Sequence, residues 1–465
     1  MSTAAEIPRI VISATGSGAG KTTASIGVIA ALCARGMRVA AFKCGPDYLD
    51  PTYHRRASGT VSHSLDGWMM GRAAVLATFT RAARDADIAV IEGMMGLFDG
   101  AAATSEEGST AEIAKWLGAP VILVTDASGM ARTVAAIAHG FAHFDDAVNL
   151  AGLICNRVGS RGHLDLLRAA SRETPIVGGL PEYAAAAFPE RHLGLFSADQ
   201  QTVPDAHIAA WARLAAEWID LDAIVAIARA APPISAASAP DASMDAPADR
   251  TRCRIGVARD DAFHFYYEDN LRRLEGLGAE LTHFSPARDR ALPAVDGLIF
   301  GGGYPEAIAD QLSSNRTMID AVRAFVARGG PLYAECGGLM YLTCAIRTLD
   351  GAAFPMAGLI AAEAVMHDRL QAIGYVEVAT TAPTPLGAAG LRFRGHQFRY
   401  STLAPSPDGV ARVYAVRPRW GGGEFAEGYC AGNLLASYVH THWASNPAAA
   451  AGFVDACVTW RMSGR

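Results

Sequence analysis

The stretch 13–23, Ser-Ala-Thr-Gly-Ser-Gly-Ala-Gly-Lys-Thr-Thr, contains the residue types of a phosphate-binding loop. Its glycines let backbone N–H groups turn toward one oxyanion, and the N-terminus of a following helix adds its dipole. Lys21 would reach the β and γ phosphates of a nucleotide, and the Thr22 hydroxyl would bind Mg²⁺. The residues predicted to bind the nucleotide are Thr15, Gly16, Ser17, Gly18, Ala19, Gly20, Lys21, Thr22 and Thr23.

One position departs from the common loop sequence. Thr15 takes the place of the first glycine, five residues before Gly20. A glycine-rich turn without a ligand would be the simpler explanation. The β-branched run 10–12 before the loop and the small-residue helical pattern 24–35 after it favour phosphate binding, because such a loop joins a strand to a helix.

Two carboxylates follow predicted strands close to this loop. Asp47 comes after strand 39–44 and a Gly-Pro turn, and Glu92 ends strand 88–91. In a doubly wound sheet the carboxyl ends of the strands gather at one edge, and Mg²⁺ prefers oxygen ligands. Thr22, Asp47 and Glu92 therefore form a predicted magnesium site. The alternatives are a turn residue for Asp47 and a helix cap for Glu92.

Cys336 has the surroundings of a nucleophile in the stretch 334–340, Ala-Glu-Cys-Gly-Gly-Leu-Met. A buried strand that ends at a cysteine, followed by two glycines and a helix, exposes the sulfur at a sharp turn and offers the N–H of Gly337 to an oxyanion. A buried structural cysteine is the alternative. The flanking glycines favour the nucleophile.

A cysteine nucleophile needs a base, and His440 and His442 follow an apolar run near the C-terminus. His440 is the predicted partner of Cys336. The loop 301–306, Gly-Gly-Gly-Tyr-Pro-Glu, follows strand 298–300 and would supply a second oxyanion donor at Gly302. An ordinary connecting loop would explain the glycines equally well.

The candidate site residues would be positioned by predicted strands that alternate with helices along the chain. The predicted strands are 10–13, 39–44, 88–91, 121–125, 150–155, 254–258, 298–300 and 331–334, and helical patterns include 72–86 and 110–117. The alternation predicts an α/β fold with two doubly wound domains. Between them, 231–250 is rich in Pro, Ala, Ser and Asp and predicts a linker, which leaves domains 1–230 and 251–465.

The bulk composition excludes several classes of protein. A chain of 465 residues is too long for one core, and 51% hydrophobic with 18% charged residues is typical of globular proteins. The net charge of −6 gives no reason to expect nucleic acid or an anionic membrane as a partner. The sequence shows no signal peptide or membrane span. Eight cysteines without a Cys-x-x-Cys pair argue against a zinc site and favour the reducing cytoplasm.

Several longer motifs of the chain resemble those of known protein families. The loop 301–306, the stretch 334–340, Arg-Gly-His-Gln-Phe at 394–398 and Ser-Tyr-Val-His-Thr-His at 437–442 resemble the class I glutamine amidotransferase domain of cobalamin biosynthesis. Gly-Pro-Asp-Tyr-Leu-Asp-Pro at 45–51 and Glu-Gly-Met-Met-Gly-Leu-Phe-Asp-Gly at 92–100 are similar to the cobyrinate a,c-diamide synthase family. The resemblance covers nearly the whole chain apart from the linker.

This resemblance implies an ATP- and glutamine-dependent ligase that amidates the a and c acetate side chains of a corrin ring, cobyrinate or hydrogenobyrinate. The first domain would be dethiobiotin-synthetase-like and would form an acyl phosphate. That group also departs from the common loop at its first glycine, where this chain has Thr15. The substrate-binding residues that the family implies are Asp47, Tyr48, Leu49, Glu92 and Asp99. Asn156 lies in a segment, 153–157, that resembles the one that reads adenine, and a turn residue at the end of a strand is the alternative for it.

Two departures from the family patterns limit what is carried over. His442 stands where class I amidotransferases commonly have a carboxylate, so a Cys–His dyad is expected, and Gln397 stands where the family often has glutamate. A diamide synthase for another ring, such as nickel-sirohydrochlorin, and a non-catalytic regulatory ATPase are the alternatives. The sequence is compatible with a monomer and with a homodimer.

Overall fold

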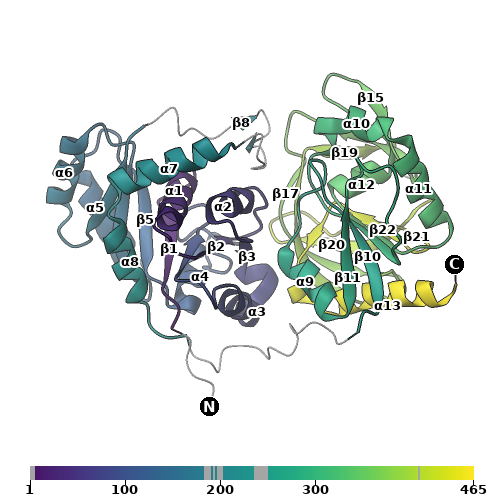
Figure 1. Cartoon of the computed structure of the whole chain (residues 1–465), viewed down its shortest axis with the longest axis horizontal. Helices are drawn as coiled ribbons and strands as arrows, with labels where there is room; N and C mark the ends of the chain where they lie inside the picture. Colours follow the sequence, from purple (N-terminus) through teal and green to yellow (C-terminus); the bar gives the residue numbers. More distant parts are fainter. Residues whose placement is uncertain are drawn as a thin grey trace, which may run out of the picture. The chain divides into compact units, whose positions relative to one another are not determined.

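The computed structural model describes residues 6–182, 190–191, 194–195, 203–234, 250–406 and 409–464 (Figure 1). The chain forms two compact units, Met1–Asp241 and Ala242–Arg465. Of the predicted linker, 235–249 lies outside the described residues. Its start packs on the first unit, because the buried Arg9 guanidinium donates to the Pro232 carbonyl at 2.5 Å and Ile234 is buried.

The first unit is built around one parallel sheet. Its elements are β1 (Arg9–Ala14), α1 (Lys21–Ala34), β2 (Val39–Cys44), α2 (Asp50–Ser58), β3 (His63–Leu65), α3 (Gly67–Ala82), β4 (Ile88–Glu92), α4 (Thr110–Leu117), β5 (Val121–Asp126), α5 (Thr133–His143), β6 (Leu150–Asn156), α6 (Arg161–Ala170), β7 (Ile176–Leu180), the short pair β8 (Glu190–Arg191) and β9 (Gly194–Leu195), α7 (Asp205–Trp218) and α8 (Leu221–Arg229). The strand order is β3-β2-β4-β1-β5-β6-β7, and each neighbouring pair is parallel.

The sequence of these strands suits a sheet that is covered on both faces. Strands β1, β2 and β4 are buried along their whole length, as expected for aliphatic strands of a parallel sheet. Helix α1 is buried over 24–32 and packs against α2 and α7 (Figure 1). The strand order reverses around β1 and β4, and in such sheets ligands bind beyond the carboxyl ends of the strands at this reversal.

The second unit contains a mixed sheet. Its elements are β10 (Cys253–Ala258), α9 (Glu268–Gly276), β11 (Ala279–Phe284), β12 (Gly297–Phe300), η4 (Pro305–Ile308), α10 (Ala309–Ser314), α11 (Arg316–Ala327), β13 (Leu332–Glu335), α12 (Gly337–Leu342), β14 (Thr343–Arg347), β15 (Ala353–Pro355), β16 (Ile360–Met366), β17 (Ala372–Thr380), β18 (Arg392–Arg399), β19 (Ser401–Ala404), β20 (Ala411–Pro418), β21 (Phe425–Ala431), β22 (Leu434–Ser437), β23 (His440–Thr441), η5 (Trp443–Ser445) and α13 (Ala448–Met462). The large sheet has the order β11-β10-β12-β13-β22-β21-β20-β17-β18-β23, and a second sheet has the order β15-β14-β16-β19.

Strands β11, β10, β12, β13 and β22 are parallel, and the rest of the large sheet is antiparallel. Only residues 438–439 separate β22, in the middle of the sheet, from β23 at its far edge. The three residue steps from Ser437 to His440 span only about 10 Å even when the chain is extended. The sheet must therefore curl until its far edge lies beside its parallel half.

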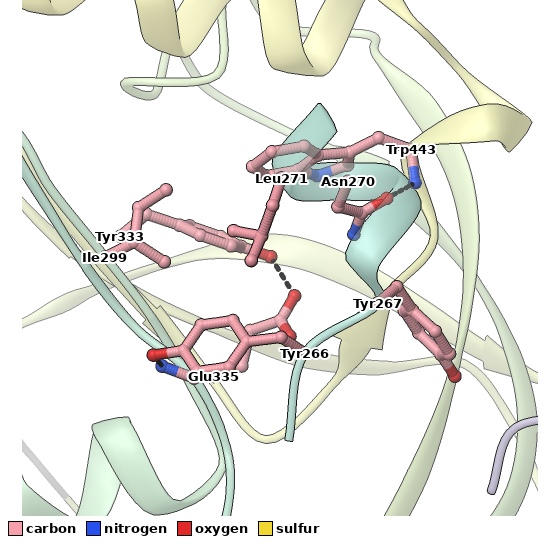
Figure 2. Close-up of a pocket in the computed structure, with 9 residues that line it drawn as sticks. Tyr266, Tyr267, Asn270, Leu271, Ile299, Tyr333, Glu335 and Trp443 are labelled. Carbon is pink, nitrogen blue, oxygen red and sulfur yellow. Dashed lines mark hydrogen bonds between the residues drawn. The ribbon is translucent and has the colours of Figure 1, made fainter. Parts of the chain in front are cut away.

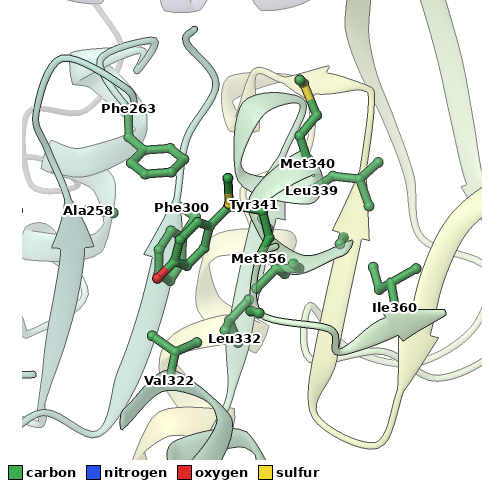
Figure 3. Packing of buried hydrophobic residues seen from close by; sticks show 14 of the residues in the cluster. Ala258, Phe263, Phe300, Val322, Leu332, Leu339, Met340, Tyr341, Met356 and Ile360 are labelled. Carbon is green, nitrogen blue, oxygen red and sulfur yellow. The ribbon is translucent and has the colours of Figure 1, made fainter. Parts of the chain in front are cut away.

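An aromatic cluster holds α12 against the parallel strands of this unit (Figure 3). Phe300 of β12 stacks on Tyr341 of α12 with ring centroids 5.3 Å apart. Phe263 meets both rings edge-on, at 5.5 and 5.6 Å. Such pairs add specific geometry to the burial of apolar surface. The start of α12, directly after Cys336, is therefore rigidly placed.

The predicted α/β class with two doubly wound domains is confirmed. The antiparallel extension of the second sheet was not predicted, because strands that mix polar and apolar residues give a weaker signal than uniformly apolar ones. Helix α3 begins at Gly67 rather than 72, since the Asp66 side chain caps it by accepting the Met69 N–H, and the helix bends at Gly71, where φ is 73°. Among the described residues, no helix combines the length and apolarity that crossing a bilayer requires.

Candidate active sites

The phosphate-binding loop connects β1 to α1 in the first unit. Gly18 and Gly20 have φ values of 78° and 96°, which favour glycine, and Gly20 directly precedes the helix. Ser17 and Gly18 are exposed, so the loop is open to a ligand. Asn156, at the end of β6, donates from Nδ2 to the Ala19 carbonyl at 3.0 Å. The structure thus brings Asn156 to the backbone of the predicted loop.

A buried cluster of charges lies next to this loop, around Glu92 at the end of β4. The Glu92 Oε1 atom accepts hydrogen bonds from Thr22 Oγ1 at 2.7 Å and from Lys43 Nζ at 3.0 Å, and Lys21 Nζ is 3.3 Å away. Its Oε2 atom lies 2.7 Å from His54 Nε2. The register of the sheet explains the contact with Lys43, because β2 and β4 pair Lys43 directly with Glu92.

The second carboxylate of this cluster is Asp50, which was not predicted. Its carboxylate forms an ion pair with Lys43 at 2.7 Å and lies 3.5 Å from Thr22 Oγ1. Asp47 has the turn role that was the alternative for it, because its Oδ1 atom accepts the N–H groups of Leu49 at 2.7 Å and Asp50 at 3.0 Å. Asp47 thereby fixes the start of α2, which carries Asp50 to Thr22.

The charges in the cluster compensate one another. Burial alone raises the pKa of Glu92, but Lys43 and Lys21 lower it, and the net pKa lies well below the usual value. Burial lowers the pKa of Lys43, whereas Asp50 and Glu92 raise it above its usual value. Burial also raises the pKa of Asp50. Glu92 is consequently an ionised oxygen donor at neutral pH, which is the form that binds a divalent cation.

The remaining residues of the predicted ring-binding set lie in the segments that follow β2 and β4. Tyr48 is buried, and Leu49 directly precedes α2. Asp99 is exposed, and its Oδ2 atom accepts the Gly96 N–H at 2.9 Å. Both segments follow the carboxyl ends of their strands, as the loop after β1 does.

Cys336 lies at a sharp turn between β13 and α12. Its φ of 44° and ψ of −99° are unusual for a residue with a side chain and are typical of a nucleophile elbow. Its N–H donates to the Ser437 carbonyl at 2.7 Å. A Cβ atom at Gly338 would overlap the Phe300 carbonyl oxygen, so glycine is needed for α12 to approach β12 this closely. The predicted elbow is therefore present, with Gly337 as the first residue of the helix.

His440 of β23 is brought beside this elbow by the curl of the sheet. It pairs with His396 of β18, and the two rings stack with centroids 5.0 Å apart. Gly302 lies against it, because a Cβ atom there would overlap the His440 ring. The predicted residues Cys336, His440, Gly302 and Gly337 are thus gathered at one place.

The protonation of the two stacked histidines differs. Burial lowers the pKa of His440, but the charge of Cys336 and then Glu335 raise it, to about 9. Burial, together with the charge of His440, lowers the pKa of His396 well below its usual value. At neutral pH His440 is therefore an imidazolium next to the sulfur, and His396 is neutral.

Models of known protein families match both units of the chain. The model of the CobQ/CobB/MinD/ParA nucleotide binding domain matches residues 10–195, and that of the CobB/CobQ-like glutamine amidotransferase domain matches 254–448. A cobyrinate a,c-diamide synthase of Leptospira interrogans is 51% identical over 97% of this chain and 99% of its own. The chain belongs to the cobyrinate a,c-diamide synthase family. A member from Syntrophotalea carbinolica is 46% identical, over 97% of this chain and 98% of its own.

A hydrogenobyrinate a,c-diamide synthase of Streptomyces coelicolor is 40% identical over 97% of this chain and 98% of its own. Membership of the cobyrinate a,c-diamide synthase family confirms the predicted kind of enzyme, a glutamine-dependent amidating ligase with a nucleotide-binding domain. These comparisons support the main prediction and neither of the two alternatives.

Both positions at which this chain departs from common patterns, His442 and Gln397, are buried. His442 is buried, its Nδ1 atom accepts the Ala444 N–H at 3.3 Å, and burial lowers its pKa to about 4. A neutral histidine that caps η5 does not replace a carboxylate. Gln397 is buried in β18, and its Nε2 atom has no hydrogen-bond partner among the residues described.

Sequence reasoning missed four residues that the structure places in the sites: Lys43, Asp50, His54 and Glu335. Lys43 gave a signal, since it is a single charge in the otherwise apolar strand Val-Ala-Ala-Phe-Lys-Cys. Asp50 and His54 are four residues apart on α2, a spacing that puts them on one helical face. Glu335 was visible as the residue before Cys336, but nothing local indicates that it meets His440.

Proposed function

We propose that this enzyme converts the a and c acetate side chains of a corrin ring, cobyrinate or hydrogenobyrinate, into amides with ATP and glutamine. One observation carries the proposal. This chain, which belongs to the family, has both the Cys336–His440 pair and a phosphate loop with an acidic cluster beside it. Each half of the reaction has its own unit.

The first unit would activate the carboxylate. A carboxylate does not accept ammonia, because oxide is a poor leaving group, whereas phosphate leaves readily. Lys21 and the N–H groups of the loop bind the β and γ phosphates, and a ring carboxylate oxygen attacks the γ phosphorus as ADP leaves. Ammonia then attacks the acyl phosphate and displaces phosphate. Tyr48, Leu49 and Asp99, together with Asp47, are the residues proposed to bind the ring, and Asn156 the adenine.

The donor atoms near the loop fit Mg²⁺, a hard ion that binds oxygen. The Thr22 hydroxyl and the ionised Glu92 lie 2.7 Å apart, and Asp50 is the nearest further carboxylate. Thr22, Glu92 and Asp50 would hold the ion, with Asp50 in place of the predicted Asp47. When bound, Mg²⁺ would neutralise charge on the phosphates of ATP. Lys43 and His54 keep Glu92 ionised and oriented.

The second unit would release ammonia from glutamine. Cys336, as thiolate, attacks the amide carbon, and the N–H groups of Gly337 and Gly302 are proposed to stabilise the oxyanion. His440 carries the proton that the departing ammonia needs. Water then hydrolyses the thioester to glutamate and restores the thiol.

A Cys336→Ala variant tests this division of labour. With cobyrinate and hydrogenobyrinate offered separately, we expect it to lose glutamine-driven amidation by at least about 10³-fold and to keep ammonia-driven amidation, because only the thiol chemistry is removed. Mass spectrometry of the ring would count the amides formed, two being expected from the wild type. Cys344→Ala, which removes an exposed cysteine of the same unit, is the matched control.

Loss of both reactions in Cys336→Ala, in a protein that melts like the wild type, would contradict the assignment of the two activities to separate sites. Phosphate release by the wild type without amidation of either ring would contradict the ring substrate.

A further inference from the structure

We propose that Glu335, the residue directly before the nucleophile, is the positioning residue of His440 and takes the part of the carboxylate that is missing at position 442. The inference rests on the proposed glutaminase role of Cys336 and His440. It assigns to this chain a Cys–His–carboxylate arrangement in which the carboxylate comes from the strand of the cysteine.

Glu335 is held by three donors at the end of β13. Its Oε1 atom accepts hydrogen bonds from Tyr333 OH at 2.6 Å, from the Thr441 N–H at 3.0 Å and from Thr441 Oγ1 at 2.9 Å. Figure 2 shows the Tyr333 hydroxyl directed at this carboxylate inside a pocket that Asn270 and Trp443 also line. The carboxylate is nine-tenths buried, so it has little freedom to turn away.

The second carboxylate oxygen faces the catalytic histidine. Glu335 Oε2 lies 3.7 Å from His440 Nδ1, and both side chains are buried. With Oε1 tied to Tyr333 and Thr441, Oε2 is left for the ring. A proton on Nδ1 that points at a carboxylate leaves Nε2 as the nitrogen that exchanges a proton with the Cys336 sulfur.

The Tyr333 hydroxyl is a donor to this carboxylate. Burial, and then the charge of Glu335, raise the pKa of Tyr333 well above its usual value, so the phenol retains its proton and donates it. Because Thr441 directly follows His440, the same carboxylate holds both the backbone of β23 and the ring that β23 carries. The titratable groups that face His440 are Cys336 on the elbow, Glu335 on β13 and His396 on β18, of which His396 is neutral.

A purely structural role for Glu335 predicts a different outcome, and Glu427 provides the comparison. Glu427 of β21 is also a buried carboxylate, and it holds the same segment from the other side through Ser437 Oγ at 2.5 Å and the Tyr438 N–H at 2.7 Å. Among the described residues it forms no hydrogen bond or ion pair with His440. Replacing either glutamate by glutamine removes a charge that tethers the 437–441 segment, but only Glu335 faces the ring.

The experiment measures glutamine hydrolysis against pH in the full-length wild type, Glu335→Gln, Glu335→Asp and Glu427→Gln. For Glu335→Gln we expect kcat to fall about 10- to 100-fold with KM for glutamine nearly unchanged, as for other groups that orient a catalytic histidine or ligand. The alkaline limb of the profile, near pH 9 in the wild type, should move to lower pH. Glu335→Asp should recover part of kcat, and Glu427→Gln should leave the limb in place.

Alkylation of Cys336 by iodoacetamide, in a Cys344→Ser background, gives a readout that needs no turnover. Its pH profile should change in Glu335→Gln and not in Glu427→Gln, since only the first change alters the partner of the thiolate. An unchanged limb and alkylation profile in Glu335→Gln, with active wild type, would overturn this inference alone. A wild type that hydrolyses no glutamine would overturn the proposed function and this inference with it.

Discussion

At the scale of single residues, the two sites depend on buried charges whose partners come from distant strands. Lys43 meets both Asp50 and Glu92, and Glu92 in turn meets Thr22 and His54. Removing one partner of a buried ion pair leaves the other charge without compensation, which costs far more than the pair itself contributes. Such residues affect stability and catalysis together.

Replacement of Lys43 by methionine is expected to impair the first unit and to leave glutamine hydrolysis by the second unit intact. The change leaves the buried Asp50 carboxylate without its ion-pair partner and removes one of the two lysines beside Glu92. It should lower the free energy of unfolding of the first unit by about 3–5 kcal/mol, with loss of ammonia-driven amidation. Differential scanning calorimetry would follow the melting, and glutamine hydrolysis below the transition should persist. Lys115→Met is the control, because Lys115 pairs with Asp145 in a partly exposed position. An unchanged first-unit transition in Lys43→Met would contradict the role of this lysine.

The raised pKa of His440 has a consequence for stability against pH. Its folded pKa of about 9 lies above the unfolded value of roughly 6.5, so its stabilising contribution is complete below pH ~6.5 and is lost as pH rises through about 9. The contribution is on the order of 3 kcal/mol. Between these pH values the wild type should therefore lose more stability than His440→Gln. Chemical denaturation at a series of pH values would measure the difference, and parallel curves would contradict it.

At the scale of elements, the second site depends on how closely α12 approaches β12. Phe263, Phe300 and Tyr341 pack the helix against the strand, and Gly338, which has no side chain, allows the two backbones to approach this closely. The elbow at Cys336 keeps its strained backbone because this packing determines both of its ends. The nucleophile is thus positioned by the packing of a short helix rather than by its own side-chain contacts.

A Gly338→Ala variant tests this dependence. The added Cβ atom would overlap the Phe300 carbonyl oxygen, so α12 must shift, at a cost of roughly 1–3 kcal/mol. We expect glutamine hydrolysis to fall at least about 100-fold, since displacements near 1 Å at a reacting group have effects of this size, while ammonia-driven amidation continues. Gly423→Ala is the control, because nothing lies within 4 Å of the added atom. Full glutaminase activity in Gly338→Ala would show that the approach of α12 is not required.

At the scale of the whole molecule, two α/β units carry two half-reactions that need each other. One makes a carboxylate reactive at the cost of ATP, and the other makes the ammonia that consumes the activated group. The chemistry of each unit is local, and for this reason the predicted variants separate glutamine hydrolysis from ring amidation. The family relatives match this chain over nearly its full length, so they contain both units as well.

The local motifs predicted the α/β class, which is confirmed. They also predicted a phosphate loop and a Cys336–His440 pair, whose residues the structure brings together. Strand, glycine turn and helix are neighbours in the chain, so their chemistry is written in consecutive residues. Asp47 shows the limit of such reasoning. It lies in the right segment, but its carboxylate closes the turn, and the next acidic residue on α2 reaches Thr22 instead.

Contacts between strands that are far apart in the chain were decided only by the tertiary structure. Lys43 lies opposite Glu92 because of the register of β2 against β4, and Glu335 meets His440 because the large sheet of the second unit curls until β23 lies beside β13. Register and curl result from packing over the whole sheet, so no spacing along the chain records them. The amino-acid sequence determines which groups can react, whereas the curl of the sheet determines which carboxylate lies beside the histidine.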